Sequence, residues 1–233
     1  MQELVAKYAL FLALALAAPA ALAHKGAPDA LLRAVAIEVI DAIKQDQGRL
    51  ASDPAKIAAL VETRIAPMFD FVHMTRLATA RNWRLATPVQ QRLLTAEFKT
   101  LLVRTYSPVL SGYRDQVIEF RSVRPEASDT EVTVKAELRQ TGKERVNLAF
   151  EMEKTRTGWK IYDVKLAGVR VIASYRDVFA EQVSDGGIDG LIKFLVDGNR
   201  QGGSRFDSAR SVFLEKSRLL FAIFHNLLRR GPQ

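Results

Sequence analysis

Cysteine is absent from this chain of 233 residues, and only three histidines are present, His24, His73 and His225. Without cysteine the chain cannot form disulfides, thiolate metal sites or cysteine nucleophiles, and three scattered histidines are too few for an ordinary zinc cluster. Acidic residues are also in the minority, because 26 Asp and Glu face 34 Lys and Arg and leave a formal net charge of +8. A basic surface suits nucleic acid, an anionic membrane or an acidic protein partner equally well.

One apolar run stands near the start of the chain. Residues 8–18 (YALFLALALAA) follow Lys7 and precede the small-residue pattern Ala-Leu-Ala at 21–23. The run is shorter than the about 20 residues that a bilayer-spanning helix needs, and the small-residue pattern is the one that signal peptidase cleaves. We therefore predict a signal peptide over residues 1–23, rather than a transmembrane anchor. An exported protein meets little nucleic acid, so the basic surface is expected to face lipid headgroups or an acidic partner.

The first half of the predicted mature chain has a helical pattern. Between residues 28 and 112 the apolar side chains recur every three or four positions. Asp53 before a proline, Asp70, and Thr87 before another proline are expected N-caps. Gln90 stands three residues after Thr87, which completes a capping box. These signals predict a succession of helices, the longest starting at Thr87.

The second half changes to a period of two, which is typical of strands with one apolar face. The pattern predicts four strands, over residues 117–123, 131–140, 145–154 and 159–166. Short turns between them indicate an antiparallel meander. Two further helices follow, separated at Gly186-Gly187. The predicted fold class is therefore α+β, with a four-stranded antiparallel sheet wrapped by about six or seven helices.

No arrangement of side chains in the sequence indicates catalysis. His73 lies among apolar helical residues without a second ligand at metal-binding spacing, so a structural role is the stronger interpretation. Glu151 and Glu153 share one strand face, as paired carboxylates of a glycosidase would, but that face is the charged one and a solvated surface is favoured. The glycines at 186–190 lack the strand and the Lys-Ser/Thr of a phosphate loop. We predict that the protein is not an enzyme and that it uses no cofactor or metal.

The expected interior is rich in large apolar side chains from both halves of the chain. Composition alone favours a filled core over a ligand cavity, and sequence patterns do not distinguish aromatic side chains that pack together from aromatic side chains that line a hole.

A series of short motifs runs through the chain in a fixed order. They are FDF at 69–71, MTRLA at 74–78, RNWR at 81–84, EFKTLLVRTY at 97–106, WKIYDV at 159–164, GV at 168–169, Tyr175-Arg176 with Phe179, and GIDGLI at 187–192. Together they resemble the toluene-tolerance family over about residues 28–200. That family includes the periplasmic phospholipid carrier of the maintenance-of-lipid-asymmetry (Mla) system.

The resemblance implies that the sheet and helices surround a hydrophobic lipid cavity. It also implies a soluble periplasmic carrier that shuttles phospholipid between an outer-membrane lipoprotein complex and an inner-membrane ATP-driven transporter with a lipid-binding subunit. A carrier of another apolar lipid such as a hopanoid, and an envelope adaptor with a filled core, remain alternatives. The residues expected to contact lipid are Phe69, Phe71, Met74, Leu102, Tyr106, Tyr113, Phe120, Val134, Ala136, Leu148, Phe150, Met152, Tyr162, Val164 and Phe179.

The chain continues beyond the region of resemblance. Residues 201–233 alternate apolar side chains with arginines and lysines, which makes a basic amphipathic extension. Membrane or partner contact and plain packing are both open for it. The predicted organisation is a signal peptide (1–23), a carrier domain (24–200) and this extension (201–233).

Overall fold

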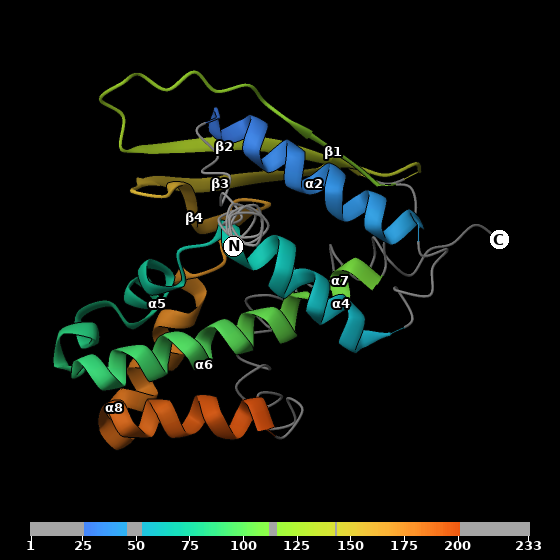
Figure 1. Cartoon of the computed structure of the whole chain (residues 1–233). Coiled ribbons are helices and arrows are strands. Elements are labelled where there is room, and N and C mark those ends of the chain that lie inside the picture. The colour runs from blue at the N-terminus through green and yellow to red at the C-terminus, as the bar shows by residue number, and fades with distance from the viewer. Residues whose placement is uncertain (1–25, 46–52, 112–115, 143, 201–233) are drawn as a thin grey trace, which may run out of the picture.

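A computed structural model describes most of the predicted carrier domain (Figure 1). The described residues are 26–45, 53–111, 116–142 and 144–200. The predicted signal peptide, the predicted C-terminal extension and Tyr113 lie outside them. Among the described residues, no helix combines the length and the apolar character that crossing a bilayer requires.

The sheet is an antiparallel meander in which each strand pairs with the next one along the chain. Its strands are β1 (Val117–Phe120), β2 (Glu131–Arg139), β3 (Val146–Thr155), β4 (Gly158–Leu166) and β5 (Val169–Arg170). The prediction of four strands was one short. The fifth strand follows a turn in which Ala167 and Gly168 have positive φ values of 48° and 85°, and two residues are too few to show an alternating pattern.

The helices precede and follow the sheet, as predicted. They are α2 (Pro28–Gln45), α4 (Pro54–Leu60), the π-helical turn η1 (Val61–Ile65), the 3₁₀ turn η2 (Ala66–Met68), α5 (Phe71–Thr79), η3 (Ala80–Leu85), α6 (Pro88–Tyr106), α7 (Pro108–Ser111), η4 (Ala173–Tyr175) and α8 (Arg176–Arg200). The arrangement differs from the six or seven separate helices predicted. The break predicted at Gly186-Gly187 is confirmed, because Gly187 takes a non-helical φ of 64° and ψ of −163° and divides α8 into two helical parts.

The predicted N-caps are confirmed. The Asp53 carboxylate accepts hydrogen bonds from two backbone N–H groups of α4. The Asp70 carboxylate accepts one from the N–H of His73 at 2.8 Å. Thr87 and Gln90 form the reciprocal capping box at the start of α6. Each cap stabilises its helix by about 1 kcal/mol, and together they fix where the helices around the sheet begin.

Two large apolar cores hold the described fold together, and a smaller cluster surrounds Val146 and Leu166 of the sheet. One lies among helices and joins α5, α6, η4 and α8 around Phe98 and Phe179. The other lies between the sheet and α2, around Val134 and Met152. Phe69 packs against both cores. Figure 1 shows α2 lying along the sheet, with α6 and α8 in a second layer away from it. The space where these two layers meet is where a cavity forms.

Candidate functional site

A cavity of about 260 Å³ lies between the sheet and the helical layer. Its walls come from η1, η2, α5, α6 and α7 on the helical side, and from β3, β4 and the segment after β5 on the other. The lining residues are Val61, Ile65, Ala66, Phe69, Phe71, Met74, Leu102, Val103, Tyr106, Ser107, Leu110, Leu148, Val164, Leu166, Val171 and Ile172. All but Tyr106 and Ser107 have side chains without a polar atom that donates or accepts strong hydrogen bonds.

The sheet wall follows from strand register. Leu148 of β3 pairs with Leu166 of β4, and Phe150 pairs with Val164. Residues directly opposite each other in an antiparallel pair project to the same face. Leu148, Val164 and Leu166 therefore share the apolar face and form one wall of the cavity.

The opposite wall is the C-terminal half of α6. Leu102 and Tyr106 are four residues apart and therefore lie above one another on one helix face. Val103 and Ser107 form a second such pair beside them. The capping box at Thr87 fixes where α6 begins, more than three turns before these lining residues.

A third wall is the chain that leads into α5. The backbone of Phe69 forms a bridge to Ile161 at the edge of β4, and the N–H of Asp70 donates to the Ile161 carbonyl at 2.8 Å. Asp70 also caps α5, so this one residue fixes both the strand contact and the helix start. The rings of Phe69 and Phe71 lie 5.9 Å apart and both line the cavity.

Lys99 of α6 covers one ring of this wall. Its ammonium lies 5.6 Å from the centre of the Phe71 ring. It also forms an ion pair with Glu62 of η1, with an N–O distance of 2.5 Å. A cation over an aromatic face is attracted to it. Lys99 thus ties α6, η1 and α5 together around the helical side of the cavity.

The two hydroxyl groups that border the cavity are already engaged with protein groups. The Ser107 hydroxyl donates to the Val103 carbonyl at 2.5 Å. The hydroxyls of Tyr106 and Tyr175 are hydrogen-bonded to each other. Burial raises the pKa of Tyr106 to about 12, so this phenol stays neutral at physiological pH. The cavity therefore presents a neutral hydrocarbon surface, which suits an apolar chain and disfavours a charged ligand.

A buried carboxylate holds the wall after β5. Asp163, only 1% exposed, accepts hydrogen bonds from the backbone N–H groups of Val164 at 2.8 Å and Ile172 at 3.1 Å. Arg170 donates to its second oxygen at 3.4 Å. Burial raises the pKa of Asp163, the principal effect, while these hydrogen bonds and Arg170 act to lower it. Because Ile172 lines the cavity, Asp163 positions part of the cavity wall from outside it.

Seven of the residues predicted to contact lipid line this one cavity. They are Phe69, Phe71, Met74, Leu102, Tyr106, Leu148 and Val164. Their contact with lipid stays a prediction, but the structure does bring them together from four separate elements.

Six other residues predicted to contact lipid belong to the two large cores instead. Phe120, Val134, Ala136, Phe150 and Met152 belong to the core between the sheet and α2, and Phe179 belongs to the helical core. These residues do lie on the apolar faces that the sequence predicts. However, α2 covers the part of the sheet that contains the first five, and Phe179 lies on α8 within the helical core. Alternation alone identified the correct face without showing which part of it is covered.

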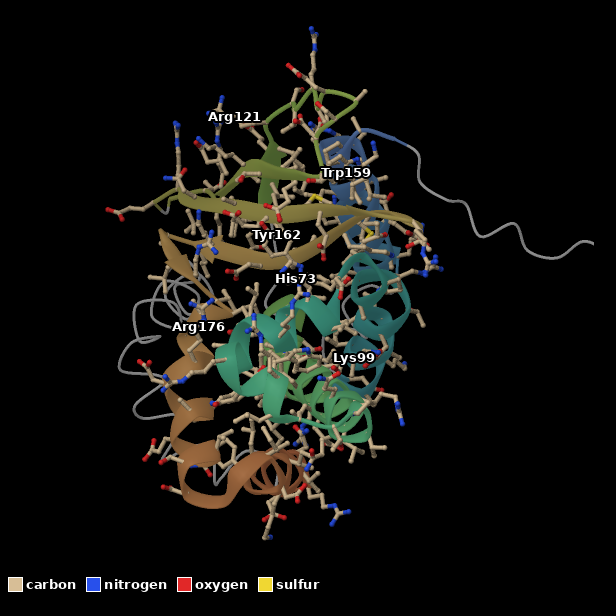
Figure 2. The ribbon with its side chains drawn as sticks, turned by 90° about the vertical axis from the view of Figure 1, so that its left-hand side faces the viewer. His73, Lys99, Arg121, Trp159, Tyr162 and Arg176 are labelled. Atoms are coloured by element: carbon tan, nitrogen blue, oxygen red, sulfur yellow. The ribbon has the colours of Figure 1, made fainter. Side chains whose placement is uncertain are left out.

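Tyr162 is placed on the opposite face of the sheet. The register between β3 and β4 shifts at Glu151 and Met152, so that Met152 pairs with Ile161. This bulge places Ile161 on the apolar face and leaves Tyr162 on the charged one. The Tyr162 ring stacks on His73 at 4.4 Å between ring centres, and Figure 2 shows the two side by side.

His73 has the structural role expected for it. Its Nδ1 lies 2.6 Å from a carboxylate oxygen of Glu153, so it joins α5 to β3 while Tyr162 joins it to β4. Glu151 corrects the expectation of a solvated charge, because it is 7% exposed and forms an ion pair with Lys165 at 2.7 Å. Across the described ranges, no cluster of three or more His, Asp or Glu side chains is close enough to hold a metal ion.

Sequence reasoning missed nine lining residues. They are Val61, Ile65, Ala66, Val103, Ser107, Leu110, Leu166, Val171 and Ile172. Val61 and Ile65 have the four-residue spacing of one helix face, which is a signal for burial but not for a cavity. Val171 and Ile172 had no such signal, because the short β5 that positions them was not predicted.

Comparison with known proteins places this arrangement in a family of lipid-binding carriers. The sequence model of the MlaC protein family matches residues 33–197, so the chain belongs to the MlaC family. The resemblance inferred from the motifs is thereby confirmed.

Individual relatives agree with this assignment. The chain is 21% identical over 168 residues to the intermembrane phospholipid transport system binding protein MlaC of Haemophilus influenzae, a match that covers 71% of this chain and 78% of that protein. It is 23% identical over 165 residues to the toluene tolerance protein Ttg2D of Pseudomonas putida, covering 70% and 75%.

A solved structure shares the fold. The phospholipid-binding protein of Ralstonia solanacearum, determined in complex with a phospholipid, is 34% identical with a TM-score of 0.69, and the match covers 77% of this chain and all of that one.

Proposed function

We propose that this protein is a periplasmic carrier that holds the acyl chains of a phospholipid in the cavity between the sheet and α6. The observation that carries the proposal is the chemistry of the cavity, whose walls are hydrocarbon and whose two bordering hydroxyls are engaged within the protein. A phospholipid is bound by the structural relative from Ralstonia solanacearum. The charged headgroup is expected to stay in water, because the cavity has no free polar group to receive it.

The energetics of transport require a site of this kind. Each methylene withdrawn from a bilayer into water costs about 0.8 kcal/mol, so an unshielded lipid with roughly thirty methylenes would cost about 24 kcal/mol. A carrier must offset most of this cost without exceeding it, since a lipid held too tightly would not be delivered. Apolar walls with few directional contacts meet that condition, because they replace one hydrocarbon environment with another.

The size of the cavity adds a further requirement. Its volume of about 260 Å³ lies just below the range of about 300–1,000 Å³ of pockets for drug-sized ligands. Two acyl chains need more room than this. We therefore propose that the helical wall moves away from the sheet wall when a diacyl lipid enters. Each layer has its own core, and Phe69 is the residue that packs against both, so we expect such a movement to change the contacts of Phe69.

We also propose partners and a location for the protein. The Haemophilus influenzae relative belongs to an intermembrane phospholipid transport system. We propose that this chain, too, shuttles phospholipid between an outer-membrane lipoprotein complex and an inner-membrane ATP-driven transporter. The apolar run at residues 8–18 and the pattern at 21–23 support export to the periplasm.

The test is to identify the bound molecule. Solvent extraction of purified protein followed by mass spectrometry should yield phospholipid in stoichiometric amount. Leu148→Asp places a charge in the cavity wall and should remove the lipid. Ile37→Asp, at an α2 side chain that is 54% exposed, is the matched control and should retain it.

Two outcomes would overturn the proposal. A hopanoid in place of phospholipid would assign a different cargo, and the absence of any lipid would favour an adaptor. Circular dichroism of Leu148→Asp checks that it is folded. If it is not, Val171→Trp, which fills the cavity without adding charge, provides the same comparison.

A further inference from the structure

An apolar patch lies at the N-terminal end of α6, away from the cavity. It consists of Leu85, Val89 and Leu93, whose side chains are 69%, 56% and 45% exposed. These are three of the six large hydrophobic residues that are exposed among the described residues. We call them the α6 end patch. Figure 1 places the start of α6 at the edge of the molecule, at the end opposite α7.

Helix geometry explains why these side chains face solvent. Val89 and Leu93 are four residues apart and occupy one face of α6. Leu94 and Phe98, which are fully buried, occupy the opposite face against the helical core. Leu85 ends η3, immediately before the capping box, and adds to the same end of the helix. The apolar side chains of this outer face are therefore not needed for packing among the described residues.

Arginines flank the patch. Arg81, Arg84 and Arg92 are exposed, and none of them forms an ion pair with another residue in the part of the chain that the structure describes. The acidic Asp189 at this end accepts a hydrogen bond from Gln90 at 2.7 Å instead. The patch thus combines exposed aliphatic side chains with exposed arginines that form no ion pair within the described ranges.

We propose that the α6 end patch binds reversibly to the surface of an anionic lipid bilayer. Aliphatic side chains on one helix face can enter the boundary between headgroups and acyl chains, and arginines beside them can reach lipid phosphates. Arginines that form no ion pair among the described residues are available to bind the phosphates of a lipid surface. Only three aliphatic residues take part, so the contact is weak, as a protein that must leave the membrane again requires.

The position of the patch determines what such contact can do. Val89 and Tyr106 are 17 residues apart on α6, which corresponds to roughly 25 Å at 1.5 Å per residue. Contact through the patch therefore leaves the cavity walls away from the lipid surface. It would recruit the protein to a membrane while a partner protein still had access to the cavity. This inference is independent of the identity of the cargo.

Vesicle flotation tests it with the full mature chain. Wild-type protein should float with vesicles of 70% phosphatidylethanolamine and 30% phosphatidylglycerol, and less with pure phosphatidylcholine. Arg81→Gln, Arg84→Gln and Arg92→Gln should each lower the partition coefficient about fivefold. Val89→Gln with Leu93→Gln should lower it by about tenfold. Raising the salt concentration should weaken the binding further.

Matched controls separate the patch from general charge and hydrophobicity. Arg104→Gln changes an exposed arginine at the other end of α6, and Ile37→Gln changes an equally exposed aliphatic residue on α2. Both should bind vesicles like wild type, and all variants should keep the wild-type melting temperature and lipid content. Equal binding by wild type and patch variants would overturn the proposal. So would patch variants that bind vesicles normally but fail to bind a transport partner protein, because the patch would then be a protein-docking site.

Discussion

The two halves of α6 carry similar residues and do different things. In the N-terminal half, Leu94 is fully buried, and just past the middle the buried ring of Phe98 makes edge-to-face contacts with Tyr175 at 4.9 Å and Phe179 at 5.1 Å. In the C-terminal half, Leu102 and Tyr106 face the cavity. The same helix with the same apolar periodicity thus contributes to a filled core at one end and an open space at the other.

The neighbouring helix explains the difference. α8 runs beside the first half of α6, where Gln90 bonds to Asp189 and Asn199 bonds to Glu97. Phe179 of α8 and Tyr175 of η4 also pack against the ring of Phe98. Nearer the end of α6, Leu102 and Tyr106 line the cavity together with Leu148 and Val164 of the sheet. Whether an apolar face packs or lines a cavity therefore depends on the element that lies opposite it.

The largest effect should come from the filled half. Phe98→Ala removes a ring from the centre of the helical core and should lower the free energy of unfolding by about 3–5 kcal/mol. Leu148→Ala, in the cavity wall, should cost much less, because its side chain already borders empty space. Urea unfolding of both variants measures the difference. Equal losses would show that the cavity wall is as tightly packed as the core.

Filling substitutions should separate the two regions next. Ala136 is 4% exposed in the core between the sheet and α2, so Ala136→Trp should lower the free energy of unfolding by about 1–3 kcal/mol through overpacking. Val164→Trp introduces the same ring into the cavity and should lower the amount of bound lipid with little loss of stability. Mass spectrometry and thermal unfolding report both properties. A strongly destabilised Val164→Trp with unchanged lipid content would contradict the comparison.

A cap substitution should change the stability of α6 without changing its cavity half. Thr87→Ala removes the hydroxyl that accepts from the N–H of Gln90 and should lower the free energy of unfolding by about 1 kcal/mol. Lipid content should stay at the wild-type level, because the lining residues lie more than three turns further along the helix. Thr87→Ser keeps the hydroxyl and should restore stability. Loss of lipid in Thr87→Ala would show that both halves of the helix respond together.

The smallest effect is a pH dependence at the cavity wall. Burial raises the pKa of Asp163 in the folded protein above its ordinary value of 3.8. The folded state therefore holds this proton to a higher pH than the unfolded state does. As a result, the free energy of unfolding falls as the pH rises above 3.8. Asp163→Asn retains an oxygen that can accept from the N–H of Ile172 and has no charge. The stability of Asp163→Asn relative to wild type should therefore increase between pH 4 and pH 7. Urea unfolding at both pH values measures this, and a relative decrease would mean that Arg170 and the backbone donors outweigh burial.

Much of the fold could be predicted from the sequence, because it depends on local chemistry. The caps at Asp53, Asp70 and Thr87 are visible as residue patterns, and strands β2, β3 and β4 are long enough for their alternation to be recognised. Strand β5 could not be predicted, since two residues have no period. The break at Gly187 could be predicted, because glycine readily adopts the positive φ that the chain takes there.

Only part of the cavity lining could be predicted from the sequence. Phe150 and Val164 are cross-strand partners on the same apolar face, yet only Val164 lines the cavity. The sequence of a strand does not contain the length and position of the helix that covers it. Tyr162 was misplaced for a different reason, because the bulge at Glu151 and Met152 reverses the faces of the residues beyond it.

That bulge also makes one peptide unit a common anchor for two walls. It leaves Tyr162 and Asp163 as adjacent residues on the outer face of β4, where the first holds His73 of α5 and the second holds the N–H of Ile172. A lipid that pushes α5 and the Ile172 segment apart would pull on Tyr162 through His73 and on Asp163 through the N–H of Ile172. Both walls would stay attached to β4 at these two adjacent residues while they move apart.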